Sequence, residues 1–342
     1  MDYSDLQIYM AEFKNTTAVS MVTRLHACSI ESLPGQKYHN LFACGTYELD
    51  ERSGQRKGEV LILDCEVLSI IAAIPCDSGI LDMKIVGNKL VVALSAGSIH
   101  MYEYEYEDTE LSFSIEVDCD VGDSEEGLFL SIDVDRRLHD NCWDCTENVD
   151  PTHIATSTQS GSVLIYRYVH CGTNNKGTLQ HHNHVEKGKT AETLGSNGGG
   201  SCNALRLVRR IPRAHDMLSE AMPAWIVAFD PHNPGYLLSG GDDCCLKIWD
   251  VSSVLRKNRE NVKTNDDDDG MDPMDADEDV PTPIEKNTKH HSAGVTSAQW
   301  HPLLSDVFAT GSYDEYVRIW QFNDGRGSAS CTGSSSSSSS SS

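Results

Sequence analysis

His215 and Asp243 have the side chains of a general base and of the carboxylate that would orient it. An imidazole takes a proton from water effectively when a carboxylate fixes its ring and its tautomer. We therefore consider His215 a candidate base and Asp243 its partner. The alternative interpretation is that the two side chains only satisfy each other's hydrogen bonds and hold neighbouring strands together.

No standard hydrolase motif accompanies this pair. The chain has neither a Gly-x-Ser-x-Gly nucleophile elbow nor a His-Glu-x-x-His zinc motif. Cys142 and Cys145 have metal-ligand spacing, but two thiols supply only half of a tetrahedral zinc site, and His139 and His153 complete no recognised pattern. We therefore expect no metal and no cofactor, and any chemistry must come from loops that converge at one face of the fold.

The elements that would position these residues repeat along the chain. Short alternating apolar runs separated by Gly, Pro, Asn and Asp predict strand, turn, strand, turn, strand in residues 224–250, and residues 295–321 repeat the pattern. The turns at 239–243 and 310–314 match, and so do Trp249 and Trp320 near the ends of the units. This internal repeat is typical of the four-stranded blades of a WD40-type β-propeller.

A histidine precedes each of the two strong repeats. WD40 repeats usually place there the histidine of a buried network with Ser or Thr, Asp and Trp, which pins the outer strands of a blade. The pattern predicts two such networks: His215, Ser239, Asp243 and Trp249, and His291, Thr310, Asp314 and Trp320.

Weaker copies of the unit lie earlier, so we expect an all-β propeller over residues 1–327 with about five recognisable blades. We place the blades at about 20–66, 67–106, 111–170, 204–252 and 289–323. The polar segments 136–150, 172–201 and 254–288 are expected to be disordered insertions, and 328–342 a serine-rich disordered tail. Because no propeller strand follows Phe322, we expect a ring that is truncated at its C-terminal end, and the alternative is a ring that closes in an unusual way. An open ring exposes apolar strand faces and unpaired edges.

Charge argues against a nucleic-acid partner, because acidic residues outnumber basic residues by 52 to 27. Part of the excess lies in residues 266–279, which we interpret as a solvated insertion. The first residues lack the basic and apolar regions of a signal peptide, and no stretch approaches the roughly 18 apolar residues of a membrane span. We therefore expect a cytoplasmic protein with reduced cysteines and without a membrane partner.

Five segments, in order, resemble the blades of the diphthine methylesterase family, which are WD40 proteins. They are residues 41–47, 80–84, 224–229, 239–243 and 309–315. The resemblance covers nearly the whole ordered chain, but the final two blades of that family have no counterpart. It implies hydrolysis of the methyl ester of methylated diphthine on elongation factor 2, which gives diphthine in diphthamide biosynthesis, and it implies elongation factor 2 as the partner.

Four residues are candidates for binding this substrate. Trp225 lies near the start of an innermost strand, Asp242 and Tyr313 directly precede the network aspartates, and Glu315 follows Asp314. Diphthine carries a quaternary ammonium group, and aromatic faces with nearby carboxylates hold such cations. For Trp225, an additional hydrophobic contact under a loop is the alternative explanation. For the whole chain, the alternative function is a non-catalytic WD40 scaffold that presents a protein-binding surface.

Overall fold

The computed structural model describes residues 22–34, 38–66, 69–107, 110–119, 126–135, 153–169, 204–253 and 281–323. Cys142 and Cys145 lie outside these residues. So do the expected insertions at 136–150 and 172–201, most of the one at 254–288, and the tail at 328–342.

Strands account for nearly all of the regular structure in the described part of the chain, so the prediction of an all-β fold is confirmed. The first sheet contains β1 (His26–Ser32), β2 (Leu41–Leu49), β3 (Arg56–Asp64) and β4 (Ser69–Cys76). The second contains β5 (Ile80–Val86), β6 (Lys89–Leu94), β7 (Ile99–Glu107) and β8 (Glu110–Cys119). The third contains β9 (Phe129–Val134), β10 (His153–Thr158), β11 (Val163–Val169) and β12 (Ala204–Ile211).

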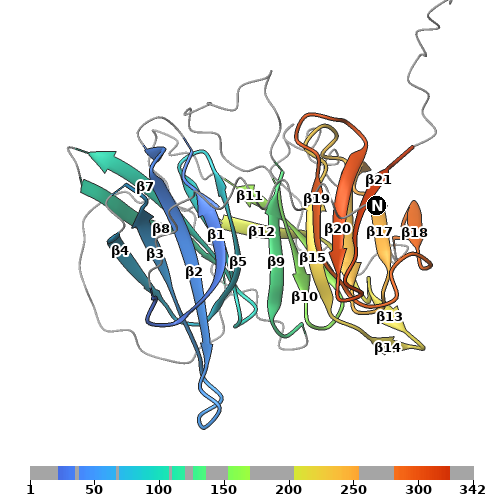
Figure 1. Cartoon of the computed structure of the whole chain (residues 1–342), viewed down its shortest axis with the longest axis horizontal. Helices are drawn as coiled ribbons and strands as arrows, with labels where there is room; N and C mark the ends of the chain where they lie inside the picture. Colours follow the sequence, from blue (N-terminus) through green and yellow to red (C-terminus); the bar gives the residue numbers. More distant parts are fainter. Residues whose placement is uncertain are drawn as a thin grey trace, which may run out of the picture.

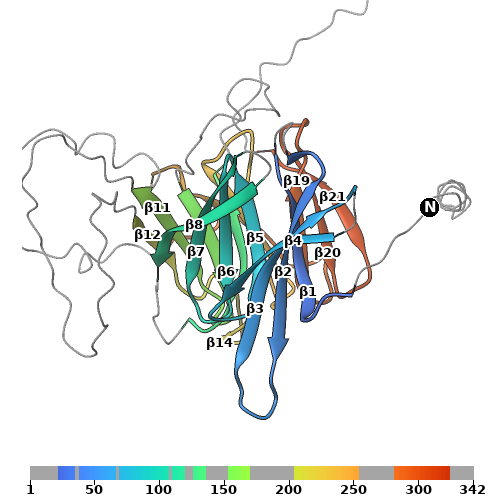
Figure 2. The same cartoon turned by 90° about the vertical axis from the view of Figure 1, so that its left-hand side faces the viewer.

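Two more sheets follow. The fourth contains β15 (Ala224–Phe229), β16 (Tyr236–Gly241), β17 (Leu246–Asp250) and β18 (Glu285–Asn287). The fifth contains β19 (Val295–Trp300), β20 (Val307–Ser312) and β21 (Val317–Gln321). A small hairpin of β13 (Asp216–Met217) and β14 (Glu220–Ala221) precedes the fourth sheet. In Figure 1 the first and second sheets lie at the left, the third in the middle and the fourth and fifth at the right, and in Figure 2 the β2–β3 hairpin reaches beyond the other strands.

In each four-stranded sheet, the outermost strand lies beyond the C-terminal end that the sequence predicted for that blade. β4, β8, β12 and β18 all begin after the expected ends at 66, 106, 170 and 252. The reason is local pairing, because the chain leaving each third strand turns back and pairs antiparallel with it. Residues 285–287 therefore form a strand inside the segment 254–288 that we expected to be an insertion.

The innermost strands share an irregularity that positions the site. β1, β5, β9, β15 and β19 each contain one extra residue near their N-terminal end, where the register against the next strand shifts. Such a β-bulge bends the strand locally and re-aims a side chain. The extra residues are Cys28, Leu81, Leu130, Trp225 and Thr296.

The hydrophobic core lies between neighbouring sheets rather than at one centre. Four separate clusters of buried side chains each join one sheet to the next. Between the fourth and fifth sheets, Leu246 and Ile248 pack with Trp300 and Phe308. Each sheet is therefore stabilised mainly by the sheet that covers its face.

Within the described residues, no further sheet covers the outer face of the fifth sheet. Val317 and Ile319 occupy the positions that Leu246 and Ile248 hold in the fourth sheet, opposite equivalent residues of the middle strand. Leu246 and Ile248 are 4% and 2% exposed, whereas Val317 and Ile319 are 76% and 72% exposed. The expected exposure of an apolar strand face is thus present on this sheet.

We predict that Ile248→Ala lowers the free energy of unfolding by about 2–5 kcal/mol, because it leaves a cavity between two sheets. The matched variant Ile319→Ala, at the equivalent uncovered position, should change it by no more than about 0.5 kcal/mol. Urea denaturation followed by circular dichroism measures both values. Equal losses would mean that the face of the fifth sheet is covered in solution.

Candidate functional site

The first predicted histidine network exists and is closed. His215 Nδ1 lies 2.7 Å from Asp243 Oδ1, and His215 Nε2 lies 2.8 Å from Ser239 Oγ. The indole Nε1 of Trp249 donates to the same Ser239 Oγ at 2.9 Å. The prediction of this network is therefore confirmed.

The order of donors in this network follows from its chemistry. The indole N–H only donates, so the Ser239 hydroxyl accepts from it and can donate its own proton to His215 Nε2. His215 then carries its proton on Nδ1 and donates it to Asp243. Burial lowers the pKa of His215, although Asp243 works against burial. Burial would raise the pKa of Asp243, but the hydrogen bond from His215 and the ammonium group of Lys247 lower it to about 2.

The second network repeats this geometry in the fifth sheet. His291 Nδ1 lies 3.0 Å from Asp314 Oδ2 and His291 Nε2 lies 2.8 Å from Thr310 Oγ1, while Trp320 Nε1 donates to Thr310 Oγ1 at 2.7 Å. A cation again pairs with the carboxylate: Arg318 in the fifth sheet and Lys247 in the fourth. Both networks therefore include the positive charge as a fifth member, which the sequence pattern did not predict.

This geometry favours the structural interpretation of His215 and Asp243. His215 is 0% exposed, and both of its ring nitrogens are engaged within the network. A general base needs a free nitrogen within hydrogen-bond reach of the proton that it removes. His215 and Asp243 bond to each other within the network of the fourth sheet, and His215 has no exposed surface.

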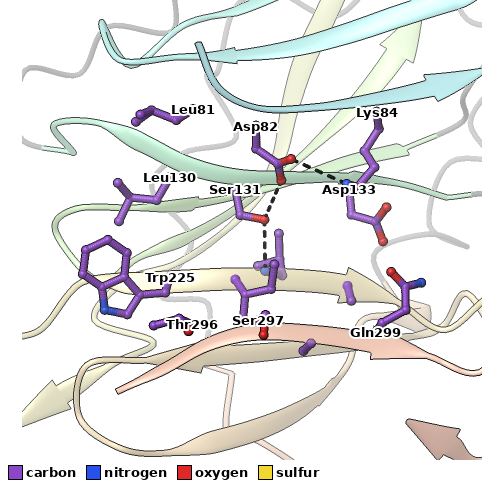
Figure 3. Close-up of a pocket in the computed structure, with 14 residues that line it drawn as sticks. Leu81, Asp82, Lys84, Leu130, Ser131, Asp133, Trp225, Thr296, Ser297 and Gln299 are labelled. Carbon is purple, nitrogen blue, oxygen red and sulfur yellow. Dashed lines mark hydrogen bonds and ion pairs between the residues drawn. The ribbon is translucent and has the colours of Figure 1, made fainter. Parts of the chain in front are cut away.

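A separate cavity lies where the innermost strands converge. It has a volume of about 280 Å³ and is lined by residues of β5, β9, β15 and β19 (Figure 3). The bulged residues Leu81, Leu130, Trp225 and Thr296 lie at one end. Asp82, Ser131 and Ser297 lie in the middle, and Lys84, Asp133 and Gln299 at the other end.

Trp225 lines the bulged end of the cavity and, with Asp242, forms what we call the rim: Asp242 does not line the cavity itself but bonds to Trp225. Trp225 is half-buried, and its Nε1 donates to Asp242 Oδ1 at 3.2 Å, which fixes the indole plane. The loop before β19 passes close to both, because Gly294 has no side chain: a Cβ there would lie 2.6 Å from Asp242 Oδ1. The Tyr313 N–H donates to the Gly294 carbonyl oxygen at 3.1 Å.

The four predicted binding residues thus separate into two groups. Trp225 and Asp242 are in direct contact, and Tyr313 adjoins them through Gly294, with a side chain that is 67% exposed. Glu315 lies in the following turn with a left-handed backbone (φ 68°). Of the four predicted residues, Trp225 is among those that line the cavity, whereas Asp242, Tyr313 and Glu315 are not.

Charged side chains of the inner strands join neighbouring sheets beneath the rim. Asp82 Oδ2 accepts hydrogen bonds from Ser131 Oγ and from the Ile132 N–H, both at 3.0 Å. Asp133 Oδ2 accepts from the Phe229 N–H at 2.7 Å. The innermost strands of neighbouring sheets do not pair with each other through a backbone ladder in the described residues. The two carboxylates instead accept hydrogen bonds from one sheet to the next.

Lys84 is the cation of this cluster. Its Nζ lies 3.0 Å from Glu31 Oε1 and 3.5 Å from Asp82 Oδ1. Burial lowers the pKa of Lys84, but Asp82, Glu31 and Asp133 outweigh burial and raise the pKa above its ordinary value. Lys84 therefore stays protonated and forms ion pairs with Glu31 and Asp82.

The sequence reasoning did not select Asp82, Lys84 or Asp133. Their signal is positional, since Asp82 directly follows the bulged Leu81, and Lys84 and Asp133 each lie three residues after a bulged residue. These residues could be identified from the sequence only if the position of each bulge were known.

The fold and the paired networks define a WD40-type β-propeller. The family described as "WD domain, G-beta repeat" matches residues 220–250 and 283–321. A crystal structure of Sqt1 from Chaetomium thermophilum, bound to the N-terminus of the ribosomal protein L10, aligns with a TM-score of 0.51 at 14% identity. It covers 87% of this chain and 61% of that one. The β-propeller domain of Cps50 (Swd1) from Myceliophteria thermophila aligns with a TM-score of 0.50 at 10% identity, over 91% of this chain and 70% of that one.

Among curated proteins, the chain is similar to diphthine methyltransferases. The "Diphthine methyltransferase homolog" of Dictyostelium discoideum is 29% identical over 308 residues, which are 82% of this chain and 65% of that protein. The "Diphthine methyltransferase" of Mus musculus is 25% identical over 323 residues, 87% of this chain and 52% of that protein. These relatives confirm the resemblance inferred from the sequence, and the chain spans between half and two thirds of their length. No helix in the described residues has the length and apolar composition of a membrane span.

We predict that Ser239→Ala leaves the Trp249 indole N–H and His215 Nε2 without a buried hydrogen-bond partner. Each unpaired group should lower the free energy of unfolding by about 1–3 kcal/mol. Ser239→Thr is the matched control, since Thr310 holds the same place in the second network. It should lose much less stability in urea denaturation. Similar losses for both variants would contradict the hydroxyl's role in the chain of donors.

Acidification should destabilise the protein through His215. Because its pKa is lower in the folded state, the unfolded state binds more protons, and stability is lost as pH falls below about 6.5. Urea denaturation at pH 7.5 and at pH 5.5 should show this loss, and a smaller loss in His215→Gln. An unchanged loss in that variant would contradict the assignment to His215.

Proposed function

We propose that the chain hydrolyses the methyl ester of methylated diphthine on elongation factor 2 and so produces diphthine in diphthamide biosynthesis. The names of the relatives support a role for the chain in that pathway. The observation that carries the proposal is the rim of Trp225 and Asp242, in which the Trp225 indole lines one end of a charged cavity and bonds to Asp242.

This rim suits a quaternary ammonium group. Such a cation has no N–H to donate and is held by an aromatic face together with a nearby carboxylate. The hydrogen bond to Asp242 keeps the Trp225 ring in one orientation, so less side-chain freedom is lost on binding. The proposal extends the rim to Tyr313, which adjoins it, and to Glu315 in the next turn.

Ester hydrolysis also needs a proton acceptor for the attacking water and a positive group near the developing oxyanion. In the proposed site, Asp82 and Asp133 are the carboxylates that can accept the proton, and Lys84 supplies the positive charge. A carboxylate takes one proton from the attacking water as the water oxygen adds to the ester carbonyl carbon, and gives that proton to the departing methoxide, which leaves as methanol. The carboxylic acid that forms then ionises and releases the second proton to solvent. His215 has no part in this scheme because it is closed off from the cavity.

We predict that Trp225→Ala lowers kcat/KM for methanol release from methylated-diphthine elongation factor 2 by about tenfold or more, the equivalent of roughly 1.4 kcal/mol of lost cation–π attraction. Trp225→Phe keeps an aromatic face and should retain most of the activity. Loss of the matching methyl mass from elongation factor 2 confirms the reaction, and circular dichroism confirms folding.

Equal activity of the Trp225→Ala and wild-type proteins would contradict the rim as the substrate site. Binding of modified elongation factor 2 without methanol release from a folded chain would favour the alternative function, a non-catalytic scaffold.

A further inference from the structure

The short hairpin of β13 and β14 contains a turn that its residues do not favour. Leu218 and Ser219 are the two central residues of the turn, and both have left-handed backbones, with φ values of 51° and 68°. Hairpin turns with two such residues usually contain Asn and Gly, because a bulky side chain is strained at positive φ. The turn therefore stores local strain, which is concentrated at functional sites in proteins.

The strained turn holds an apolar side chain in solvent. Leu218 is 93% exposed and the neighbouring Met217 is 38% exposed, so burial of Leu218 within the fold does not offset the strain. The Arg213 guanidinium donates to the Ser219 carbonyl oxygen and thereby ties the turn to the start of the hairpin. Leu218 is thus presented to solvent by a backbone that is fixed on both sides.

The base of the β13–β14 hairpin is anchored to the third sheet. The Met222 N–H donates to the His215 carbonyl oxygen at 3.1 Å, and the His215 N–H donates to the Gly161 carbonyl oxygen at 2.9 Å. Gly161 has a φ of 82°, and a Cβ there would collide with the carbonyl oxygens of both His215 and Met222. The hairpin is therefore preorganised, and a ligand that contacts it does not have to order it first.

The hairpin also lies next to the rim. Only three residues separate Ala221, at the end of β14, from Trp225, and the Asp242 N–H donates to the Pro223 carbonyl oxygen at 2.9 Å. In Figure 1, β13 and β14 lie at the lower right, where the chain enters β15. A protein that places one of its side chains at Trp225 therefore brings the surrounding surface close to the hairpin.

Acidic side chains border the apolar tip. Glu220 is exposed, and Asp216 lies 3.8 Å from the Arg213 guanidinium, with the two side chains 42% and 51% exposed. An apolar pocket that is bordered by basic side chains complements this arrangement, because its centre covers Leu218 and its border faces Glu220.

We propose that the β13–β14 hairpin is a docking element for the protein that carries the substrate side chain, and that Leu218 and Met217 enter an apolar pocket of that protein bordered by basic residues. The identity of this protein, elongation factor 2, rests on the proposed function. The hairpin takes no part in the chemistry. It adds affinity for the whole folded factor, which a short peptide with the same modified residue does not gain.

Binding of methylated-diphthine elongation factor 2 tests the hairpin without reference to turnover. Leu218→Gly removes the apolar tip and suits the left-handed backbone, so the variant should resist urea at least as well as wild type. Its Kd for the factor, measured by biolayer interferometry, should rise about tenfold or more. Ser219→Gly is the matched control: it relieves strain at the next position, keeps the leucine and should bind as wild type does.

A second pair of variants tests the acidic border. Glu220→Gln should raise the Kd about threefold at low salt, and the difference from wild type should shrink as salt increases. Glu285→Gln removes an exposed carboxylate on the outermost strand β18 and should leave the Kd unchanged.

Methanol release separates this inference from the proposed function. With the whole factor as substrate, Leu218→Gly should raise KM and leave kcat unchanged. With a short peptide cut from the factor around the modified residue, its kcat/KM should equal that of wild type. The inference is overturned if wild type does not bind the factor, if Leu218→Gly binds it as tightly as Ser219→Gly, or if Leu218→Gly loses activity on the peptide as well. Methanol release that is independent of the hairpin refutes this inference alone, whereas hairpin-dependent binding without methanol release refutes the proposed function alone.

Discussion

Face-to-face packing of consecutive sheets is the interaction on which the rest of this structure depends. Backbone hydrogen bonds run within each sheet, so neighbouring sheets are held mainly by the apolar clusters between them and by a few side-chain bonds of the inner strands. The contrast between Ile248 and Ile319 shows how completely burial depends on the next sheet. The angle between sheets also sets how far apart the inner strands lie, and thus the width of the cavity that they line.

The polar groups of the protein divide into two systems with different physical properties. In the first histidine network, hydrogen bonds run from Trp249 through Ser239 and His215 to Asp243, and Lys247 pairs with the carboxylate. Such a closed chain stabilises one arrangement and has nothing left to offer a ligand. In the cavity, by contrast, Asp82 and Asp133 bond to groups of a neighbouring sheet, and Lys84 pairs with Asp82 and with Glu31 of β1.

Sequence reasoning succeeded where the determining contacts lie within one repeat. The two networks could be predicted because His215, Ser239, Asp243 and Trp249 belong to one unit whose copy at His291 has the same spacing. It failed where contacts join different repeats: Asp82 bonds to the backbone of β9, and Asp133 to that of β15. Neither partner is close in sequence, and a one-residue bulge decides which side chain faces the cavity. The outermost strands were shifted for a similar reason, because each pairs with the end of the preceding unit.

The bulges also explain why an aromatic rim and a charged interior occur together. A regular strand sends successive side chains to opposite faces, so it cannot direct two adjacent residues toward one cavity. The extra residue at Leu81 lets Leu81 and Asp82 both line the cavity, and the extra residue at Trp225 does the same for Trp225 and Ile226. Five strands use this device, but only β15 places an indole at the bulge and only β5 follows it with a carboxylate. Any selectivity of the cavity therefore arises from differences between the repeats, while their common features maintain the fold.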